Sequence, residues 1–338
     1  MSQPSTEMIG IGNNVAQIKL MLSELVLQPR LNAIKWSIIT KQTPNIKVGY
    51  PGQHLASLIT GMEGERTGAR GNDLLDGSEV KSCSRIDQLD RCLSCDASVA
   101  RLETSCAGCN STKILRNNDS KWLFGIRDED ELNLLTKEVP RIVLILADYP
   151  NFDEGDFDTI RFQSFEIWTN NPRHKRFGEI MNNYYANIYL AHKKNNANKT
   201  PAPKNFWPYS FQFYISNPIR TFSCIVKNAN TSPKIFFEEY IEPKVNRDRL
   251  QSVLMPADVL NDVEIQLLLK KATDKELAAA MNQKTATRVR PAELRRMLPT
   301  KAREHIATIG EELRAYLPLR DTDRITTSKI KYSRKKRA

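Results

Sequence analysis

Residues 72–82 read Asn-Asp-Leu-Leu-Asp-Gly-Ser-Glu-Val-Lys-Ser and bring carboxylates, a turn dipeptide and a Glu-x-Lys sequence into one short stretch. The dipeptide Asp76-Gly77 is a strong signal for a β-hairpin. Because side chains alternate between the faces of a strand, Glu79 and Lys81 are expected on one face of the strand that follows. A carboxylate beside an ammonium suits metal-dependent hydrolysis of a phosphodiester, which needs oxygen ligands for Mg²⁺ and a cation near the attacking water.

This chemistry needs a second acid upstream of Glu79, and two aspartates are candidates. A strict two-residue hairpin would place Leu74 opposite Glu79 and turn Asp73 toward the other face, so Asp73 requires a bulge or an irregular turn. In a regular hairpin Asp76 is the alternative ligand, although an aspartate in a turn commonly bonds its own backbone. We favour Asp73 and keep Asp76 as the alternative.

A helix predicted from Gln53 to Thr60 precedes a glycine-rich stretch. Glycine suits a backbone that must bend sharply and approach a phosphate closely, and a mobile surface loop is the alternative. These glycines are Gly61, Gly64, Gly68, Gly71 and Gly77. No Gly-Lys-Ser/Thr sequence follows them, which argues against a nucleotide-binding P-loop.

These residues resemble the PD-(D/E)xK nuclease superfamily, whose signature is an acid on one strand followed by Glu-x-Lys on the next. The lead-in at 50–55, the Gly-Ala-Arg-Gly at 68–71, the motif itself and a cysteine-rich insertion after it are similar to type II restriction endonucleases of the MamI-like family. The resemblance covers about residues 50–125. Asn72 precedes Asp73, where the superfamily motif usually has proline.

The resemblance implies a Mg²⁺ site formed by Asp73, Glu79 and the backbone carbonyl of Val80. Lys81 would hold the attacking water, help to deprotonate it and stabilise the transition state. A lysine suits this role because its pKa can shift between metal-bound carboxylates, which a guanidinium cannot usefully do. The implied fold is an α/β restriction-endonuclease-like core with a mixed central sheet flanked by helices. The implied partner is double-stranded DNA with a symmetric site, cut by a homodimer with one active centre per subunit.

Two Cys-x2-Cys pairs separated by ten residues are the second strong signal, formed by Cys92, Cys95, Cys106 and Cys109. This spacing is typical of the two knuckles of a tetrahedral Zn²⁺ site. Disulfides are disfavoured because the sequence shows no signal-peptide pattern and is rich in lysine. Four sulfur ligands fill the coordination shell, so the ion would hold the insertion together and would not activate water. No histidine lies between the two pairs, which argues against a His-Asn-His nuclease.

The chain is basic, with 50 Lys and Arg against 39 Asp and Glu, a net charge of +11 over 338 residues and a pI of about 9.3. This charge suits a polyanion binder, and ribosomal or membrane-surface proteins share it. The tail at 329–337 is basic and either lies on phosphates or stays solvated. Four basic residues lie near the cysteines in the sequence: Arg91, Arg101, Lys113 and Arg116. They either contact the DNA backbone or belong to a knuckle that only stabilises the fold. The longest apolar run, Ile142–Ala147, is too short to span a bilayer, so we expect a soluble cytoplasmic protein.

Hydrophobic patterns elsewhere predict elements in an order typical of an α/β core. An amphipathic helix is predicted at 13–26, with an apolar stripe of Val15, Ile18, Leu22, Leu25 and Val26. We predict strands at 121–126, 141–147, 164–169, 210–215 and 221–226, and helices at 130–137 and 173–192. The cysteine insertion then falls between the second and third strands of the core.

This order divides the chain into an N-terminal helical segment (1–50), a catalytic core (51–225) with the zinc insertion at about 90–112, and a helical C-terminal region (226–338). In the last region we predict helices at 259–271, 274–281, 291–298 and 302–317. Residues 275–296 resemble a helix-turn-helix, and a simple packing unit is the alternative. Its candidate DNA contacts are Arg288, Arg290, Arg295 and Arg296.

The combined interpretation is a Mg²⁺-dependent type II restriction endonuclease with a structural Zn²⁺ site. One alternative is a repair or junction-resolving nuclease of the same superfamily. The other is a zinc-containing nucleic-acid-binding protein without catalysis.

Overall fold

The computed structural model describes residues 14–44, 47–65, 73–196, 201–281 and 289–321. The predictions for Gly68, Gly71, Arg288 and the basic tail at 329–337 concern residues outside these ranges. Within the described ranges, no helix is both long and apolar enough to cross a lipid bilayer.

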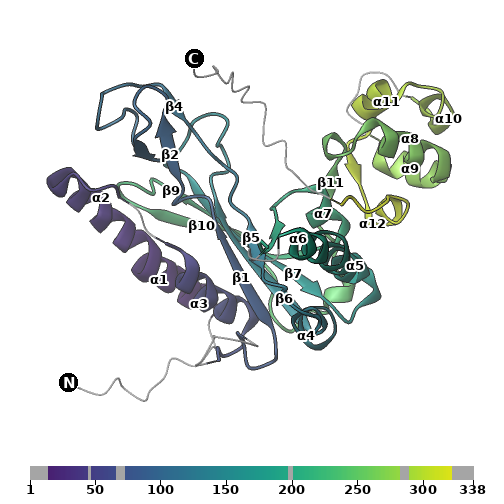
Figure 1. Ribbon diagram of the computed structural model, residues 1–338, viewed down its shortest axis with the longest axis horizontal. Helices are drawn as coiled ribbons and strands as arrows, with labels where there is room; N and C mark the ends of the chain where they lie inside the picture. Colours follow the sequence, from purple (N-terminus) through teal and green to yellow (C-terminus); the bar gives the residue numbers. More distant parts are fainter. Residues whose placement is uncertain (1–13, 45–46, 66–72, 197–200, 282–288, 322–338) are drawn as a thin grey trace.

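A mixed five-stranded sheet forms the centre of the molecule (Figure 1). In spatial order its strands are β1 (Glu79–Ser84), β6 (Arg141–Asp148), β7 (Ile160–Trp168), β9 (Ile219–Lys227) and β10 (Lys234–Tyr240). β1 runs parallel to β6, and the other neighbouring strands are antiparallel. The predicted mixed central sheet is therefore confirmed, and β10, which the sequence analysis did not predict, forms one edge.

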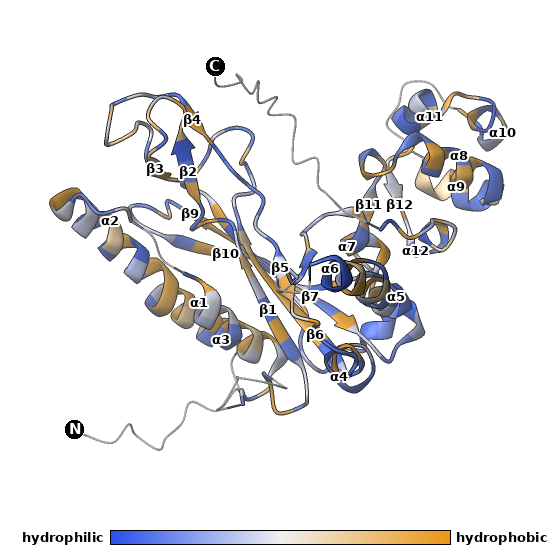
Figure 2. Cartoon of the chain, viewed as in Figure 1, coloured by the Kyte–Doolittle hydropathy of each residue, from blue (hydrophilic) through white to orange (hydrophobic). Residues whose placement is uncertain are grey.

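β6 is buried along its whole length, as the apolar run Ile142–Ala147 predicts. Its side chains alternate, so that Ile142 and Leu144 join the core on one face of the sheet while Val143 and Ile145 join the core on the other. A period of two lets a single apolar strand serve two cores. Figure 2 shows the resulting hydrophobic character of the central strands.

Helices from the start of the chain cover one face of the sheet (Figure 1). They are α1 (Asn14–Leu22), the π-helical turn η1 (Ser23–Leu27) and α3 (Gly49–Thr60), while α2 (Gln28–Thr40) continues from η1 with Arg30 as its one buried residue. The predicted N-terminal helix is confirmed over its described part and continues through α2. Ile18, Leu22 and Val26 are buried, as expected. Val15 and Leu25 are exposed, contrary to the prediction, because the buried stripe follows positions four residues apart and these two flank it.

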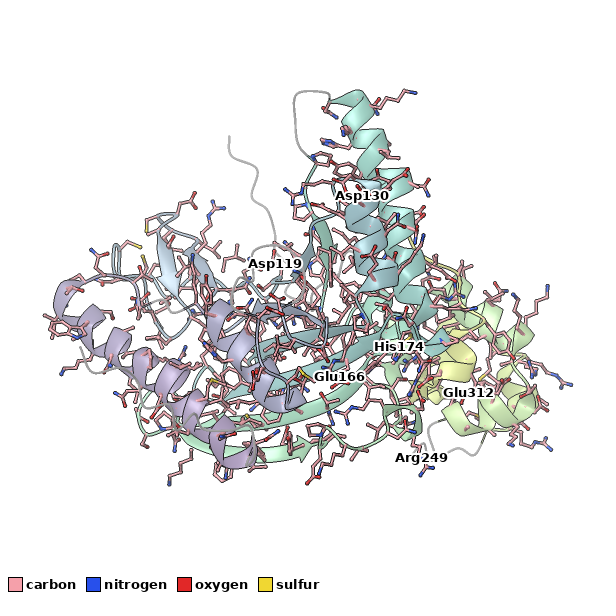
Figure 3. The ribbon with its side chains drawn as sticks, turned by 90° about the horizontal axis from the view of Figure 1, so that it is seen from below. Asp119, Asp130, Glu166, His174, Arg249 and Glu312 are labelled. Atoms are coloured by element: carbon pink, nitrogen blue, oxygen red, sulfur yellow. The ribbon has the colours of Figure 1, made fainter. Side chains whose placement is uncertain are left out.

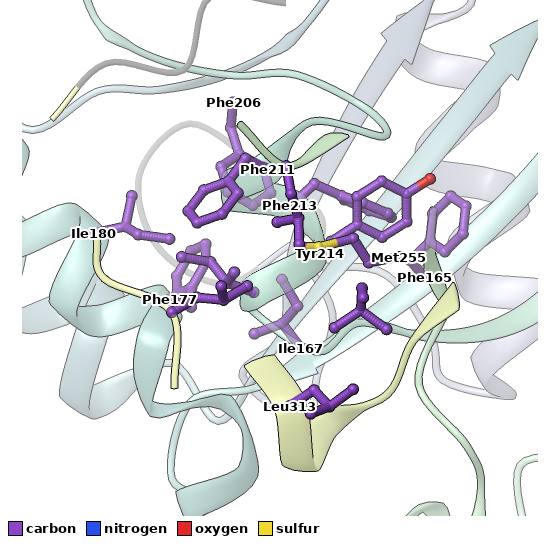
Figure 4. Packing of buried hydrophobic residues seen from close by; sticks show 14 of the residues in the cluster. Phe165, Ile167, Phe177, Ile180, Phe206, Phe211, Phe213, Tyr214, Met255 and Leu313 are labelled. Atoms are coloured by element: carbon purple, nitrogen blue, oxygen red, sulfur yellow. The ribbon is translucent and has the colours of Figure 1, made fainter. Parts of the chain in front are cut away.

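The other face is covered by elements from the middle of the chain. They are α4 (Glu129–Asn133), η2 (Leu134–Glu138), η3 (Pro172–His174), α5 (Lys175–Asn183), η4 (Tyr184–Tyr189), α6 (Leu190–Asn195) and α7 (Phe211–Ile215). The helices predicted at 130–137 and 173–192 are confirmed. Figure 4 shows this core, in which Phe165 of β7 packs edge-on against Phe213 of α7 with ring centroids 5.1 Å apart.

Residues 210–215, predicted as a strand, form the helix α7 instead. The hydroxyl of Ser210 accepts the backbone N–H of Phe213 at 3.2 Å and caps the helix. Every residue of α7 is buried, so its sequence carries no amphipathic period. An apolar run of this length does not distinguish a buried strand from a buried helix, which explains the wrong prediction.

Residues between β1 and β6 form a separate lobe and one strand of a small sheet. The lobe contains β2 (Leu89–Cys92), β3 (Ser98–Ala100) and β4 (Ile114–Leu115). β5 (Trp122–Phe124) pairs with β8 (Lys204–Phe206), so the strand expected at 121–126 exists but its predicted place in the central sheet is wrong. The buried indole N–H of Trp122 in β5 donates to the carbonyl of Ile145 in β6 at 2.9 Å, which joins β5 to the central sheet.

The C-terminal region consists of short elements (Figure 1). They are η5 (Arg247–Arg249), β11 (Met255–Pro256), η6 (Ala257–Val259), α8 (Asp262–Lys271), α9 (Asp274–Ala280), α10 (Pro291–Leu294), α11 (Pro299–His305), β12 (Thr308–Ile309) and α12 (Glu311–Arg314). The single helix predicted at 302–317 is wrong, because β12 interrupts it to pair with β11. Arg295, a candidate DNA contact, pairs with Asp274 at 2.8 Å and donates to the carbonyl of Ala272, which favours the packing-unit alternative.

Candidate active site and cysteine cluster

The acidic segment forms an irregular turn and not the regular hairpin expected from Asp76-Gly77. The N–H of Gly77 donates to the carbonyl of Leu74 at 3.0 Å, so Asp76 lies in the middle of the turn. The N–H groups of Asp73 and Leu74 both donate to the carbonyl of Ser78, at 2.9 and 3.1 Å. Two consecutive residues thus share one acceptor, a local irregularity of the kind that Asp73 required.

The strand that leaves this turn pairs with β6 and not with the chain before the turn. Leu74 forms only an isolated bridge with Gly64. The hairpin prediction is therefore wrong in its pairing partner, while the predicted strand that carries Glu79 and Lys81 is confirmed. Pairing with the fully buried strand β6 anchors β1 at one edge of the central sheet.

Asp73 is held by two hydrogen bonds from different elements. The backbone N–H of Val80 donates to its Oδ2 at 2.7 Å, and Nε2 of Gln53 donates to its Oδ1 at 3.1 Å. Glu79 and Lys81 lie on either side of Val80 in β1, and Nζ of Lys81 donates to Oε1 of Glu79. The structure thus brings all three predicted catalytic residues to the start of β1, with Glu79 and Lys81 in direct contact.

Burial dominates the electrostatics of the two acids. It raises the pKa of Asp73, against the effects of the Val80 N–H and of Lys81. It also raises the pKa of Glu79, where Lys81 opposes the rise and the charge of Asp73 adds to it. Two part-buried carboxylates share one ammonium, so the ionised site has an excess negative charge. A divalent cation with hard oxygen ligands fits this donor set, because it would supply the missing positive charge.

Asp76, the alternative ligand, is engaged in the turn itself. Its Oδ1 accepts the N–H of Ser78 at 3.1 Å, and its Oδ2 accepts from the guanidinium of Arg141. These bonds are the local role that an aspartate commonly has in a turn. The geometry therefore favours Asp73 over Asp76 as the acid beside Glu79.

A glycine allows α3 to approach the strand that carries the site. A Cβ on Gly52 would lie 2.0 Å from Oγ of Ser82 in β1, so only glycine permits this packing distance. The close approach places the next residue, Gln53, within reach of Asp73. The role of Gln53 was not predicted from the sequence, although its position in the lead-in at 50–55 was a signal.

The four predicted zinc ligands come together in the lobe after β1. The Sγ atoms of Cys92, Cys95, Cys106 and Cys109 all lie within 4.8 Å of one another. A tetrahedral ion with bonds of about 2.3 Å requires sulfur atoms about 3.8 Å apart, so the cluster fits Zn²⁺. The backbone N–H of Ser94 donates to Sγ of Cys92 at 3.4 Å, which stabilises a thiolate. The cluster can therefore hold a metal ion, as the spacing predicts.

Of the basic residues near the cluster, Arg101 is buried and Arg116 is partly buried, and both make contacts within the lobe. Arg101 and Arg116 both pair with the buried carboxylate of Asp90, at 2.9 and 2.8 Å. The guanidinium of Arg101 also lies 4.9 Å from the ring centroid of Phe152, which follows β6. For these two arginines the structure favours the alternative of a stabilising knuckle, because Asp90 pairs with both of their charges inside the lobe. Lys113 is exposed.

Comparison with known proteins gives matches of two kinds. The model of a family described as MamI restriction endonuclease matches residues 35–258, which is more than half of the chain. The chain is also 40% identical over 57 residues to the type II restriction enzyme MamI of Microbacterium ammoniaphilum. That match covers 17% of this chain and 18% of the relative, so it spans less than a fifth of either protein. No solved structure matches the chain.

Proposed function

The chain belongs to the MamI restriction endonuclease family, and on that premise we propose that it is a type II restriction endonuclease that hydrolyses DNA phosphodiester bonds with Mg²⁺. The observation that carries the proposal is the cluster at the start of β1. There the N–H of Val80, the residue between Glu79 and Lys81 in β1, donates a hydrogen bond to Asp73. The ammonium of Lys81 contacts Glu79.

In this proposal Asp73, Glu79 and the carbonyl of Val80 hold the metal. Bound Mg²⁺ would supply Lewis-acid polarisation of the phosphate and a lower pKa for a bound water. Gln53 and the N–H of Val80 keep the Asp73 carboxylate oriented. The partial burial that raises the pKa of both acids also reduces their contact with bulk water, which strengthens the charge interactions inside the site.

Lys81 has two tasks in the proposed reaction. Nζ of Lys81 would orient the attacking water and, as the neutral amine, accept its proton, and the ammonium that forms would offset the negative charge that grows on the phosphate oxygens. The contact with Glu79 keeps Nζ at the metal-binding edge of β1. A flexible exposed lysine would lose side-chain entropy on reaching this position, whereas Lys81 is already held there.

Two features lie beyond the active site in this proposal. The four cysteines bind a structural Zn²⁺ that holds the lobe together. Two chains form a homodimer, since cutting both strands of a symmetric site requires an active centre for each strand.

The test is cleavage of a plasmid in the presence and absence of Mg²⁺. The wild-type protein is expected to give discrete double-strand fragments, and Lys81→Ala to lose cleavage by about 10²–10⁴-fold while it retains DNA binding. Lys234→Ala is the matched control, because Lys234 is an exposed lysine on the edge strand β10. Nicking that depends on DNA structure would favour a repair nuclease. DNA binding without cleavage by the wild-type protein would contradict the proposal.

A further inference from the structure

We propose that Arg141 is a positioning residue for the metal-binding acids of this site, and this inference rests on the proposed function. Arg141 is the first residue of β6 and is only 5% exposed. Its Nε donates to Oγ of Ser78 at 2.9 Å, and its guanidinium also pairs with Asp76. Both partners belong to the turn that leads into Glu79. Arg141 therefore holds the turn from the neighbouring strand.

The effect of Arg141 reaches the proposed metal ligand through Ser78. Ser78 is fully buried, and its carbonyl accepts the N–H of Asp73 at 2.9 Å. Its side chain is bonded to Arg141, so one residue joins the arginine to the backbone of Asp73. Ser78 also directly precedes Glu79, so its position sets where β1 begins. Fixing Ser78 thus fixes the two acids relative to each other.

A second acid, the buried Glu166, also orients the guanidinium of Arg141. Glu166 in β7 is 0% exposed and lies 3.7 Å from Arg141. The same carboxylate accepts from Arg247 at 3.2 Å and from the indole N–H of Trp168 at 3.0 Å. Figure 3 shows Glu166 on the central sheet, near the middle of the view. The charges therefore alternate from the turn into the core, in the order Asp76, Arg141, Glu166 and Arg247.

Removing the guanidinium should loosen the turn without removing a metal ligand or Lys81. Metal affinity should fall because the two acids would no longer be held at one separation. Residues that orient metal ligands typically contribute 10–100-fold to metal affinity. Small displacements of a catalytic group carry a comparable cost in rate. DNA binding should change little, since Arg141 is buried.

The experiment measures Mg²⁺ binding by calorimetry and, separately, single-turnover cleavage against Mg²⁺ concentration. For Arg141→Gln we expect Mg²⁺ affinity about 10–100-fold weaker, with partial recovery in Arg141→Lys. Arg161→Gln is the matched control, because Arg161 pairs with Asp148 at 2.7 Å at the opposite end of the β6 and β7 pair. The control should lose stability yet keep wild-type Mg²⁺ affinity.

The two measurements separate the inference from the proposed function. Wild-type Mg²⁺ affinity in folded Arg141→Gln, or an equal loss in Arg161→Gln, would overturn the role of Arg141. Absence of cleavage by the wild-type protein would instead overturn the proposed function. Should Arg141→Gln fail to fold, Ser78→Ala decides the question, because it deletes only the hydroxyl that Arg141 contacts. That variant should weaken Mg²⁺ binding in the same direction, and an unchanged affinity would contradict the proposal.

Discussion

The backbone N–H of Val80 donates a hydrogen bond of 2.7 Å to Oδ2 of Asp73, seven positions earlier in the chain. This bond joins an acid before the turn to the strand after it. The small sequence separation between Asp73 and Glu79 therefore does not keep the two carboxylates apart. Within the turn, the carbonyl of Ser78 accepts from the N–H groups of both Asp73 and Leu74, which brings Asp73 close to the start of β1.

The first prediction concerns the choice between the two aspartates. Asp73→Asn keeps an oxygen that accepts the Val80 N–H but removes the charge that a metal needs, so cleavage should fall by more than about 100-fold. Asp76→Asn changes only the turn and its contact with Arg141, so its loss should be about tenfold or less. Single-turnover rates at saturating Mg²⁺ compare the variants. A larger loss of cleavage in Asp76→Asn than in Asp73→Asn would indicate that Asp76, and not Asp73, is the metal ligand.

The second prediction concerns stability and pH. Burial raises the pKa of Asp73 and Glu79 above the ordinary values of 3.8 and 4.5 in the folded, metal-free protein. The folded state then binds protons more tightly than the unfolded state, so these groups lower stability as pH rises from the ordinary values through the raised ones. Glu79→Gln should therefore raise the Tm of the metal-free protein at neutral pH. The gain should shrink as pH falls toward the ordinary values.

Thermal unfolding in EDTA and in excess Mg²⁺ checks this expectation. Mg²⁺ should reverse the order of the Tm values of the wild type and Glu79→Gln. Mg²⁺ binding to the folded wild-type site adds stability, and Glu79→Gln largely loses that binding. Glu239→Gln is the control, since Glu239 of the edge strand β10 pairs with Arg220 of the neighbouring strand β9. A lower Tm for metal-free Glu79→Gln at neutral pH would show that burial of the charge is not the dominant effect.

The third prediction concerns the approach of α3 to β1. Gly52→Ala would place a methyl group 2.0 Å from Oγ of Ser82, so the helix must move, at a cost of about 1–3 kcal/mol. The movement should also take Gln53 away from Asp73 and reduce cleavage. Gly49→Ala is the matched control, because a Cβ there meets no atom within 4 Å. The double variant with Ser82→Gly should recover stability and activity, and failure to recover would contradict the packing argument.

The fourth prediction concerns the cysteine cluster. Metal analysis of the purified protein should give one Zn²⁺ per chain, and Cys95→Ser should lose it. Cys224→Ala should keep the ion, because Cys224 is buried in β9 outside the cluster. Since the contact of Arg101 with the ring of Phe152 attaches the lobe to the core without metal, Cys95→Ser should loosen the lobe and leave the central sheet folded. Hydrogen exchange that increases across the whole sheet would contradict this separation.

The sequence by itself determined the local features of this protein. The buried strand over Ile142–Ala147 followed from its unbroken apolar run, which is short for a helix and rich in β-branched residues. The cysteine cluster followed from its spacing, since a metal ion imposes its own geometry on four thiolates. The shared face of Glu79 and Lys81 followed from the two-residue period of a strand.

Only the tertiary structure decided which partners these elements have. The pairing of β1 with β6 joins residues far apart in the chain, and no local pattern records it. For the same reason the sequence left Asp73 and Asp76 open, and it gave no sign of the contact of Arg141 with the turn. Buried charges such as Arg101 resemble surface charges in a sequence, because only the folded lobe brings the neutralising partner, here Asp90 in β2, beside them.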